Sequence, residues 1–219
     1  MRELANEQTC WFIFCGSKIL IRQLRDSESA LFNFPETLAL TCLSREEMDE
    51  VITRPLETLG IHMDDVSAVL DAAWALTSGH PNLTQFVGRV LVNASNENQN
   101  RSIGQADVEN LWTDAAFVQF YFDTIWGAAS PLERLITLLM PPEPFGSSDV
   151  EKVFHAVGAS VTSIQIDAGL ETLVAYSVLK RVGRLHTFVP MAFHRLLDLN
   201  YEKERLIARE VEKVNGGME

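Results

Sequence analysis

The sequence predicts a mostly α-helical fold that begins with a short α/β segment and ends with a small α+β domain. Apolar residues recur at helical spacing over much of residues 44–173. Residues 11–15 form an apolar run closed by a Gly-Ser pair, which is typical of a strand buried on both faces. Residues 176–182 and 185–189 flank a glycine and are expected to form a β-hairpin.

The composition is that of an ordinary globular chain. Hydrophobic residues make up 47% of the 219 residues, enough for a core, and the formal net charge of −12 argues against a protein whose main role is to hold nucleic acid. No apolar run is long enough to cross a membrane, and residues 1–10 lack the apolar segment of a signal peptide. Cys10, Cys15 and Cys42 fit no metal-binding spacing and are typical of reduced core thiols. We therefore expect a cytoplasmic protein with no membrane contact and no metal site.

Residues 1–43 are expected to be the remaining part of an α/β domain. A buried strand at residues 11–15 needs neighbours, and residues 37–40, after Pro35, are the one further candidate. Two short strands do not make a stable sheet by themselves. The chain is therefore expected to begin in the middle of an α/β domain, and the edge of the first strand is expected to seek a partner.

Residues 44–128 are expected to form a helical domain. Ser44 and Glu47 have the spacing of a capping box, so a helix begins there. It is expected to reach about residue 53, and Pro55 is expected to bend or restart it.

Two further helices, residues 66–76 and residues 83–92, are expected to meet at a tight turn. Gly79 is expected to supply the left-handed residue that ends the first helix, and Pro81 fits the first turn of the second. By geometry alone this is a helix–turn–helix corner. The Asn-rich residues 95–102 are expected to be a loop.

A long helix is expected over residues 108–127, after Asp107. It is rich in aromatic residues, and an aromatic stripe at helical spacing is typical of a core. We expect this helix to join the helical domain to the C-terminal domain. The aromatic residues are Trp112, Phe117, Phe120, Tyr121, Phe122 and Trp126.

Residues 129–200 are expected to form a winged helix, in which three helices precede a two-stranded wing. Ser130 begins the first helix, with Pro131 at its first position and Glu133 two residues later. The charged residues 201–219 are expected to form a solvated helix that frays at its end. The other predicted helices span residues 148–155, 162–173 and 190–199.

The predicted corner carries the motif Gly79-His80-Pro81, with Gln85 four residues after the proline. Residues 40–61 are LTCLSREEMDEVITRPLETLGI, an apolar step into a capped helix that contains Arg-Pro-Leu. Residues 40–61 resemble the stretch that links the last core strand to the helical lid in STAND-type and archaeal-type AAA+ ATPases. The Gly-x-Pro turn resembles the lid signature of the same family, and the two features are separated along the chain as they are in that family. Residues 187–197, TFVPMAFHRLL, resemble the wing strand and final helix of that family. The resemblance covers essentially the whole chain but only about the C-terminal half of a typical member.

The resemblance implies a core remnant at residues 1–43, a lid at residues 44–128 and a winged helix at residues 129–200. The phosphate-binding Gly-x-x-x-x-Gly-Lys-Ser/Thr loop of the family is absent, and so is an apolar strand ending in paired acids that would hold Mg²⁺. We therefore expect no catalytic residue and no ATP hydrolysis in this chain by itself. ATP or ADP with Mg²⁺ is expected as a cofactor only where a P-loop half completes the site.

The resemblance also implies a set of nucleotide contacts. Ser17 falls where the family places its sensor-1 residue, which orients the attacking water. The Gly79-His80-Pro81 turn would form the wall against the adenine. Arg22 and Arg25 either face a phosphate across a subunit boundary or are surface arginines of a solvated helix.

The predicted winged helix raises the question of DNA binding. Lys180, Arg181 and Arg184 cluster near the turn of the wing and are the candidate DNA contacts. The charged residues of the predicted recognition helix are Asp167 and Glu171, which phosphate would repel. We therefore favour a module that contacts protein over one that reads DNA.

The sequence thus predicts a piece of a STAND-like AAA+ regulatory or signalling ATPase that acts as a nucleotide-sensing lid and a winged-helix interaction module. Its expected partner is a protein, including the missing N-terminal half. One alternative is a DNA-binding winged-helix protein related to replication-initiator ATPases. A second alternative is an ATPase that a separate P-loop subunit completes in trans.

Overall fold

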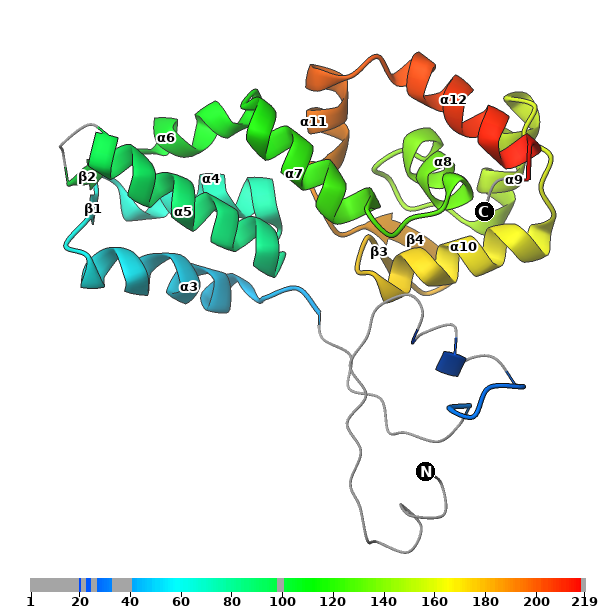
Figure 1. Ribbon diagram of the computed structural model, residues 1–219, viewed down its shortest axis with the longest axis horizontal. Helices are drawn as coiled ribbons and strands as arrows, with labels where there is room; N and C mark the ends of the chain where they lie inside the picture. The colour runs from blue at the N-terminus through cyan, green and yellow to red at the C-terminus, as the bar shows by residue number, and fades with distance from the viewer. Residues whose placement is uncertain (1–19, 21–22, 25–26, 33–40, 98–100, 218–219) are drawn as a thin grey trace, which may run out of the picture. The chain divides into compact units, whose positions relative to one another are not determined.

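The structure is a computed structural model of the chain, and it describes residues 20, 23–24, 27–32, 41–97 and 101–217 (Figure 1). The chain divides into two compact units, residues 1–40 and residues 41–219, and the second contains every element named below. The strands predicted at residues 11–15 and 37–40 lie outside the described residues, as do Ser17, Arg22 and Arg25.

Within the described residues the fold is mostly helical, as the sequence predicts. The strands there are short and form two separate two-stranded sheets. The first group of elements is α3 (Arg45–Thr58), β1 (His62–Met63), α4 (Val66–Thr77), α5 (Pro81–Glu97), β2 (Ser102–Ile103), α6 (Gln105–Glu109), η1 (Asn110–Trp112) and α7 (Ala115–Trp126). The second group is α8 (Pro131–Leu139), α9 (Ser147–Ala156), α10 (Ser163–Ala175), β3 (Leu179–Val182), β4 (Leu185–Phe188), α11 (Phe193–Asn200) and α12 (Lys203–Asn215).

Helix α3 begins at the predicted capping box. The Ser44 hydroxyl accepts from the Glu47 N–H at 3.2 Å, and the Glu47 carboxylate accepts from the Ser44 N–H at 2.8 Å. The helix continues through Pro55 instead of restarting there. Pro55 has no N–H, so the carbonyl four residues earlier in the helix lacks its usual partner. Because Pro55 lies on the exposed face of α3, water can bond to that carbonyl instead. The buried face of α3 packs against α5 (Figure 1).

The Asn-rich segment is shorter than predicted. Helix α5 continues to Glu97, and Ser102 belongs to β2, which pairs in parallel with β1. The register places His62 opposite Ser102 and Met63 opposite Ile103, whose side chain is buried. Parallel strands are joined by a long crossover, so the two strands are far apart in the sequence and no local pattern predicts their pairing.

The long helix predicted over residues 108–127 is wrong, because this stretch is divided into α6, η1 and α7. The break falls at Asp114, whose carboxylate accepts from the Phe117 N–H at 2.7 Å and caps α7. The aromatic residues nevertheless belong to the core, as predicted. Phe117, Tyr121 and Phe122 are buried, and the others pack against them.

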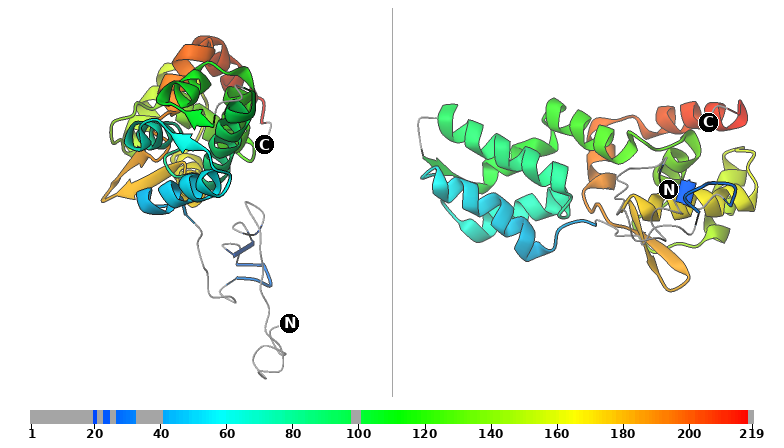
Figure 2. Two further views of the ribbon diagram at one scale, coloured as in Figure 1. Left: turned by 90° about the vertical axis from the view of Figure 1, so that its left-hand side faces the viewer. Right: turned by 60° about the horizontal axis from the view of Figure 1, so that its bottom comes forward.

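The second group contains the predicted helices and hairpin in the predicted order. The capping boxes of Ser130 and Thr162 begin α8 and α10. Strands β3 and β4 are antiparallel, and a single bridge joins Phe145, between α8 and α9, to His186 of β4. Figure 2 shows the hairpin projecting from the helices.

The prediction of a fully solvated helix after residue 201 is wrong, because α12 is partly buried. One face of α12 packs against α8, and Glu210 on that face is only 1% exposed. The Glu210 carboxylate accepts from Arg209 Nε and Lys213 Nζ, both at 3.0 Å. The charged residues of α12 hide an apolar stripe at helical spacing, formed by Leu206, Ile207, Val211 and Val214.

An aromatic cluster joins the first group of elements to the second. Phe193 of α11 lies 5.7 Å, between ring centroids, from both Phe122 and Trp126 of α7, and 5.5 Å from Phe188 of β4. The Trp126 indole N–H also donates to the Thr137 hydroxyl of α8 at 2.9 Å. Within residues 41–97 and 101–217, the buried side chains of the two groups therefore form one continuous core.

Candidate functional site

The corner between α4 and α5, residues 77–81, is the candidate functional site. Gly79 is left-handed at the end of α4, as predicted, but the residue that caps α4 is Ser78, which is left-handed too. The φ of Ser78 is 47°, and its N–H donates to the Trp74 carbonyl at 2.8 Å. Gly79 follows with a φ of 74°, so two consecutive residues have positive φ. Pro81 is the first residue of α5, where its missing N–H costs no hydrogen bond.

The segment that enters α3 packs directly on Gly79. The Leu43 N–H donates to the Gly79 carbonyl at 2.8 Å. A Cβ atom added at position 79 would lie 2.2 Å from the Leu43 carbonyl oxygen and 3.1 Å from the Trp74 ring. Glycine is therefore required here both by its positive φ and by the close approach of a second backbone.

Thr77 holds the corner from beneath. Its side chain is fully buried, and its hydroxyl donates to the Ala73 carbonyl at 2.9 Å and accepts from the Gly79 N–H at 3.3 Å. The same hydroxyl lies 3.5 Å from the sulfur of Met48, so α3 packs against Thr77 at the corner.

A contact between distant parts of the chain completes the corner. The Met191 N–H, in the connection between β4 and α11, donates to the Ser78 hydroxyl at 2.9 Å across 113 residues. Ser78 and Gly79 thus hold the entry to α3 on one side and the C-terminal group on the other. Sequence reasoning missed Leu43, Ser78 and Met191 as parts of this site. Of these three residues, only Ser78 is adjacent to the motif in the sequence, directly before Gly79.

His80 is half-buried at the start of α5. Its Nδ1 atom is buried and has no hydrogen-bond partner among the described residues, and the same holds for the hydroxyl of Thr84 one turn later. Burial lowers the pKa of His80, so the ring is neutral at pH 7. A neutral imidazole has one nitrogen that donates and one that accepts. His80 can therefore form a hydrogen bond with a ligand.

We expect the protein to lose stability as the pH falls from 7.5 to 5.5. The pKa values of His80, His186 and His194 are lowered chiefly by burial. Below about pH 6.5 the unfolded chain therefore binds protons that the folded chain does not, and the free energy of unfolding decreases. Urea titration at the two pH values measures the difference. His80→Gln should reduce it, whereas the same substitution of the exposed His155 should not; equal pH dependence in both variants would contradict this account.

The predicted basic cluster of the hairpin does not lie on one face. Register places Arg181 opposite His186 and Lys180 opposite Thr187, so Arg181 and Lys180 point to opposite faces of the sheet. Arg181 turns toward α10 and forms an ion pair with Glu171. Lys180 is exposed on the other face, and Arg184 is exposed at the turn.

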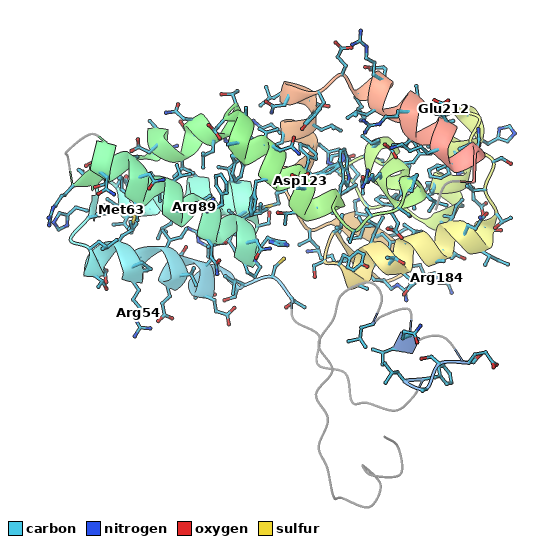
Figure 3. The ribbon with its side chains drawn as sticks, in the orientation of Figure 1. Arg54, Met63, Arg89, Asp123, Arg184 and Glu212 are labelled. Carbon is cyan, nitrogen blue, oxygen red and sulfur yellow. The ribbon has the colours of Figure 1, made fainter. Side chains whose placement is uncertain are left out.

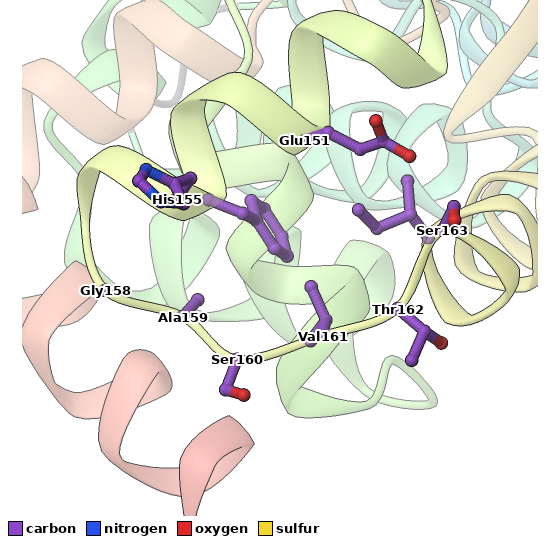
Figure 4. Close-up of a pocket in the computed structure, with 10 residues that line it drawn as sticks. Glu151, His155, Gly158, Ala159, Ser160, Val161, Thr162 and Ser163 are labelled. Atoms are coloured by element: carbon purple, nitrogen blue, oxygen red, sulfur yellow. The ribbon is translucent and has the colours of Figure 1, made fainter.

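Two of the cavities among the described residues lie in the second group, and neither of these two is lined by the corner residues. One, of about 720 Å³, is open at the loop between α9 and α10 (Figure 4). The other, of about 460 Å³, lies between α10 and the hairpin. No cluster of three metal-ligating side chains occurs in the described part of the chain. Every helix described is too short or too polar to cross a bilayer.

Comparisons with known proteins give matches to solved structures alone. No protein-family model matches the chain, and no curated protein does. Among solved structures, Thermotoga maritima RuvB, described as a Holliday junction branch migration motor, is 14% identical, with a TM-score of 0.36 over 80% of this chain and 55% of that one. A point mutant of the same protein has a TM-score of 0.37 at 14% identity, over 83% and 56%. The chain thus spans a little over half the length of these RuvB chains, and TM-scores of this size establish neither a shared family nor a shared function.

Proposed function

We propose that this chain is the nucleotide-sensing lid and protein-contacting part of a STAND-like AAA+ regulatory switch, with residues 129–200 as a winged helix. We also propose that it does not hydrolyse ATP by itself. The observation that carries the proposal is the corner at residues 77–81. It presents a proline and an unpaired neutral histidine, and it is bonded to two distant backbone segments.

The corner fits the adenine part of a nucleotide. Pro81 offers an apolar ring, and the half-buried ring of His80 offers its other nitrogen, Nε2, to the edge of a base, because Nδ1 is buried. The sequence contains no P-loop, so the phosphates and Mg²⁺ would be held by a P-loop half when one is present. The chain's own role is then to sense the base and not to position the γ-phosphate.

Nucleotide at the corner would act on both bonded segments. Leu43 precedes α3, and Met191 precedes α11, so movement of Ser78 or Gly79 alters both hydrogen bonds together. A ligand that binds one arrangement of these segments more tightly shifts the population toward it. Opening and closing of packed domains about such a junction is a common form of regulatory switch.

The proposal predicts weak binding of nucleotide through the base alone. In a titration of the ¹⁵N-labelled chain, adenosine and ADP should shift the same amide signals, those of residues 77–80 and 82–84, with similar dissociation constants of about 1 mM. His80→Ala should weaken both, and His155→Ala, at an exposed histidine, should not. Shifts confined to other residues, or no shifts at several times that concentration, would show that the corner is not a nucleotide site.

The DNA-binding alternative is disfavoured by the charges around α10. Asp167 and Glu171 are the charged residues of that helix, and Arg181 is already paired with Glu171. We expect no binding of duplex DNA tighter than about 10⁻⁴ M at physiological salt, because that is the weak end of non-specific affinity. Fluorescence anisotropy over a range of salt concentrations measures it. A steep salt dependence whose slope falls by about one in Lys180→Gln or in Arg184→Gln would favour DNA binding instead.

A further inference from the structure

The cleft between α10 and the β3–β4 hairpin is a separate candidate site. Its volume is about 460 Å³, which is the size of a pocket for a small ligand or for one or two side chains. Polar and charged groups converge on it from both sides. The polar and charged residues that line it are Ser147, Asp167, Glu171, Arg181, Arg184 and His186.

His186 is the buried polar group of this cleft. The alternation of β4 places its side chain on the inner face, and it is 5% exposed. Two backbone hydrogen bonds to Phe145, of 2.8 and 3.0 Å, hold the residue in place. Neither ring nitrogen has a hydrogen-bond partner among the described residues. Buried polar atoms are normally paired, so this ring has an unused donor and an unused acceptor.

The charges of the cleft are only partly paired. Arg181 and Glu171 form an ion pair with each other. Asp167 accepts a hydrogen bond of 2.6 Å from the Ser147 hydroxyl, which carries no charge to compensate the carboxylate. Arg184 has no ion pair with any described residue, and Figure 3 labels it near α10 and the hairpin. The cleft therefore has one uncompensated negative charge on its helix side and one uncompensated positive charge on its hairpin side.

This pattern selects the chemistry of the ligand. A nucleic-acid phosphate or an acidic peptide would meet Asp167, and a purely basic peptide would meet Arg184. A peptide with one basic and one acidic side chain can pair with both. Its backbone amide can donate to and accept from His186, which burial and the nearby Arg181 keep neutral by lowering its pKa.

We propose that this cleft binds a segment of a partner protein that carries a basic and an acidic residue close together, the basic one on Asp167 and the acidic one on Arg184. This inference rests on the proposed function only in that the C-terminal group contacts protein. It names the surface and the chemistry of the partner.

The test uses the full ¹⁵N-labelled chain and synthetic nine-residue peptides. Two contain a lysine and a glutamate separated by one residue, in either order, within glycine and serine; two controls carry two lysines or two glutamates instead. One of the mixed peptides should shift the backbone amides of α10 and the hairpin and the ring signals of His186. Asp167→Asn and Arg184→Gln should each weaken it about fivefold. Lys180→Gln, on the opposite face of the hairpin, should leave it unchanged.

The proposal is overturned if neither mixed peptide binds, if the lysine peptide binds as well as the mixed ones, or if both cleft substitutions leave binding unchanged. The outcome is distinguishable from failure of the proposed function, because adenosine is read at residues 77–84 and the peptide is read at α10 and the hairpin. Loss of the nucleotide response with an intact peptide response would remove the switch and keep the peptide site.

Discussion

Replacing Phe193 by alanine is expected to lower the free energy of unfolding by about 3–5 kcal/mol. The side chain is fully buried and lies among Phe122, Trp126 and Phe188. Truncation removes its own burial and leaves a cavity between α7, β4 and α11, which the surrounding rings can fill only in part. Urea denaturation followed by far-UV circular dichroism measures the change.

Two control variants separate this effect from a general sensitivity of the fold. Phe193→Leu keeps most of the volume and should cost less than about 1.5 kcal/mol. Ile164→Ala truncates a side chain that is 80% exposed and should stay within about 0.5 kcal/mol of the parent chain. Losses of the same size in Phe193→Ala and Ile164→Ala would mean that the aromatic cluster is not the junction of the two groups.

Gly79→Ala is expected to lower the free energy of unfolding by about 2–4 kcal/mol. Alanine is disfavoured at a φ of 74° by about 1–2 kcal/mol, and its Cβ would lie 2.2 Å from the Leu43 carbonyl oxygen, so the backbone must move as well. The displacement would also lengthen the hydrogen bond between Leu43 and Gly79. Thermal unfolding of the variant and the parent chain measures the loss.

Gly88→Ala is the matched control for this prediction. Gly88 lies inside α5, and a Cβ added there meets no atom within 4 Å. Alanine should therefore stabilise the chain by about 0.5–1 kcal/mol, because it favours the helix and restricts the unfolded state. If the two glycine substitutions had the same effect, the corner would not be the tightly packed junction that its geometry indicates.

The sequence could predict the elements whose signals are local. The capping boxes at Ser44, Ser130 and Thr162 each involve residues three apart, and the structure forms all three. The division of the long helix was also visible in principle, since Asp114 is a good N-cap residue. The aromatic content of that stretch favoured one continuous helix and concealed the break.

Elements that depend on distant partners could not be predicted in this way. Strand β1 pairs with β2 across the whole of α4 and α5, and each strand has only two residues. Helix α12 is charged enough to resemble a solvated helix, and only its packing against α8 explains the burial of Glu210. Such pairings are decided by tertiary contacts and not by local propensity.

In the candidate site, too, the local features can be predicted from the sequence and the contacts between distant residues cannot. The Gly79-His80-Pro81 motif and the start of α5 were predicted from adjacent residues. The hydrogen bond between Ser78 and Met191 joins residues 113 positions apart, and no pattern in the sequence indicates it. The charges of the hairpin were identified, but their faces depend on register, which separates Lys180 from Arg181.

We expect a nucleotide at the corner to act on both segments bonded to it. Amide hydrogen exchange at Leu43 and Met191, measured by NMR with and without ADP, tests this directly, because these two N–H groups donate to Gly79 and Ser78. We predict that ADP slows the exchange of both amides together and that His80→Ala abolishes the effect. Unchanged exchange of both amides at an ADP concentration that saturates the chain would contradict the claim.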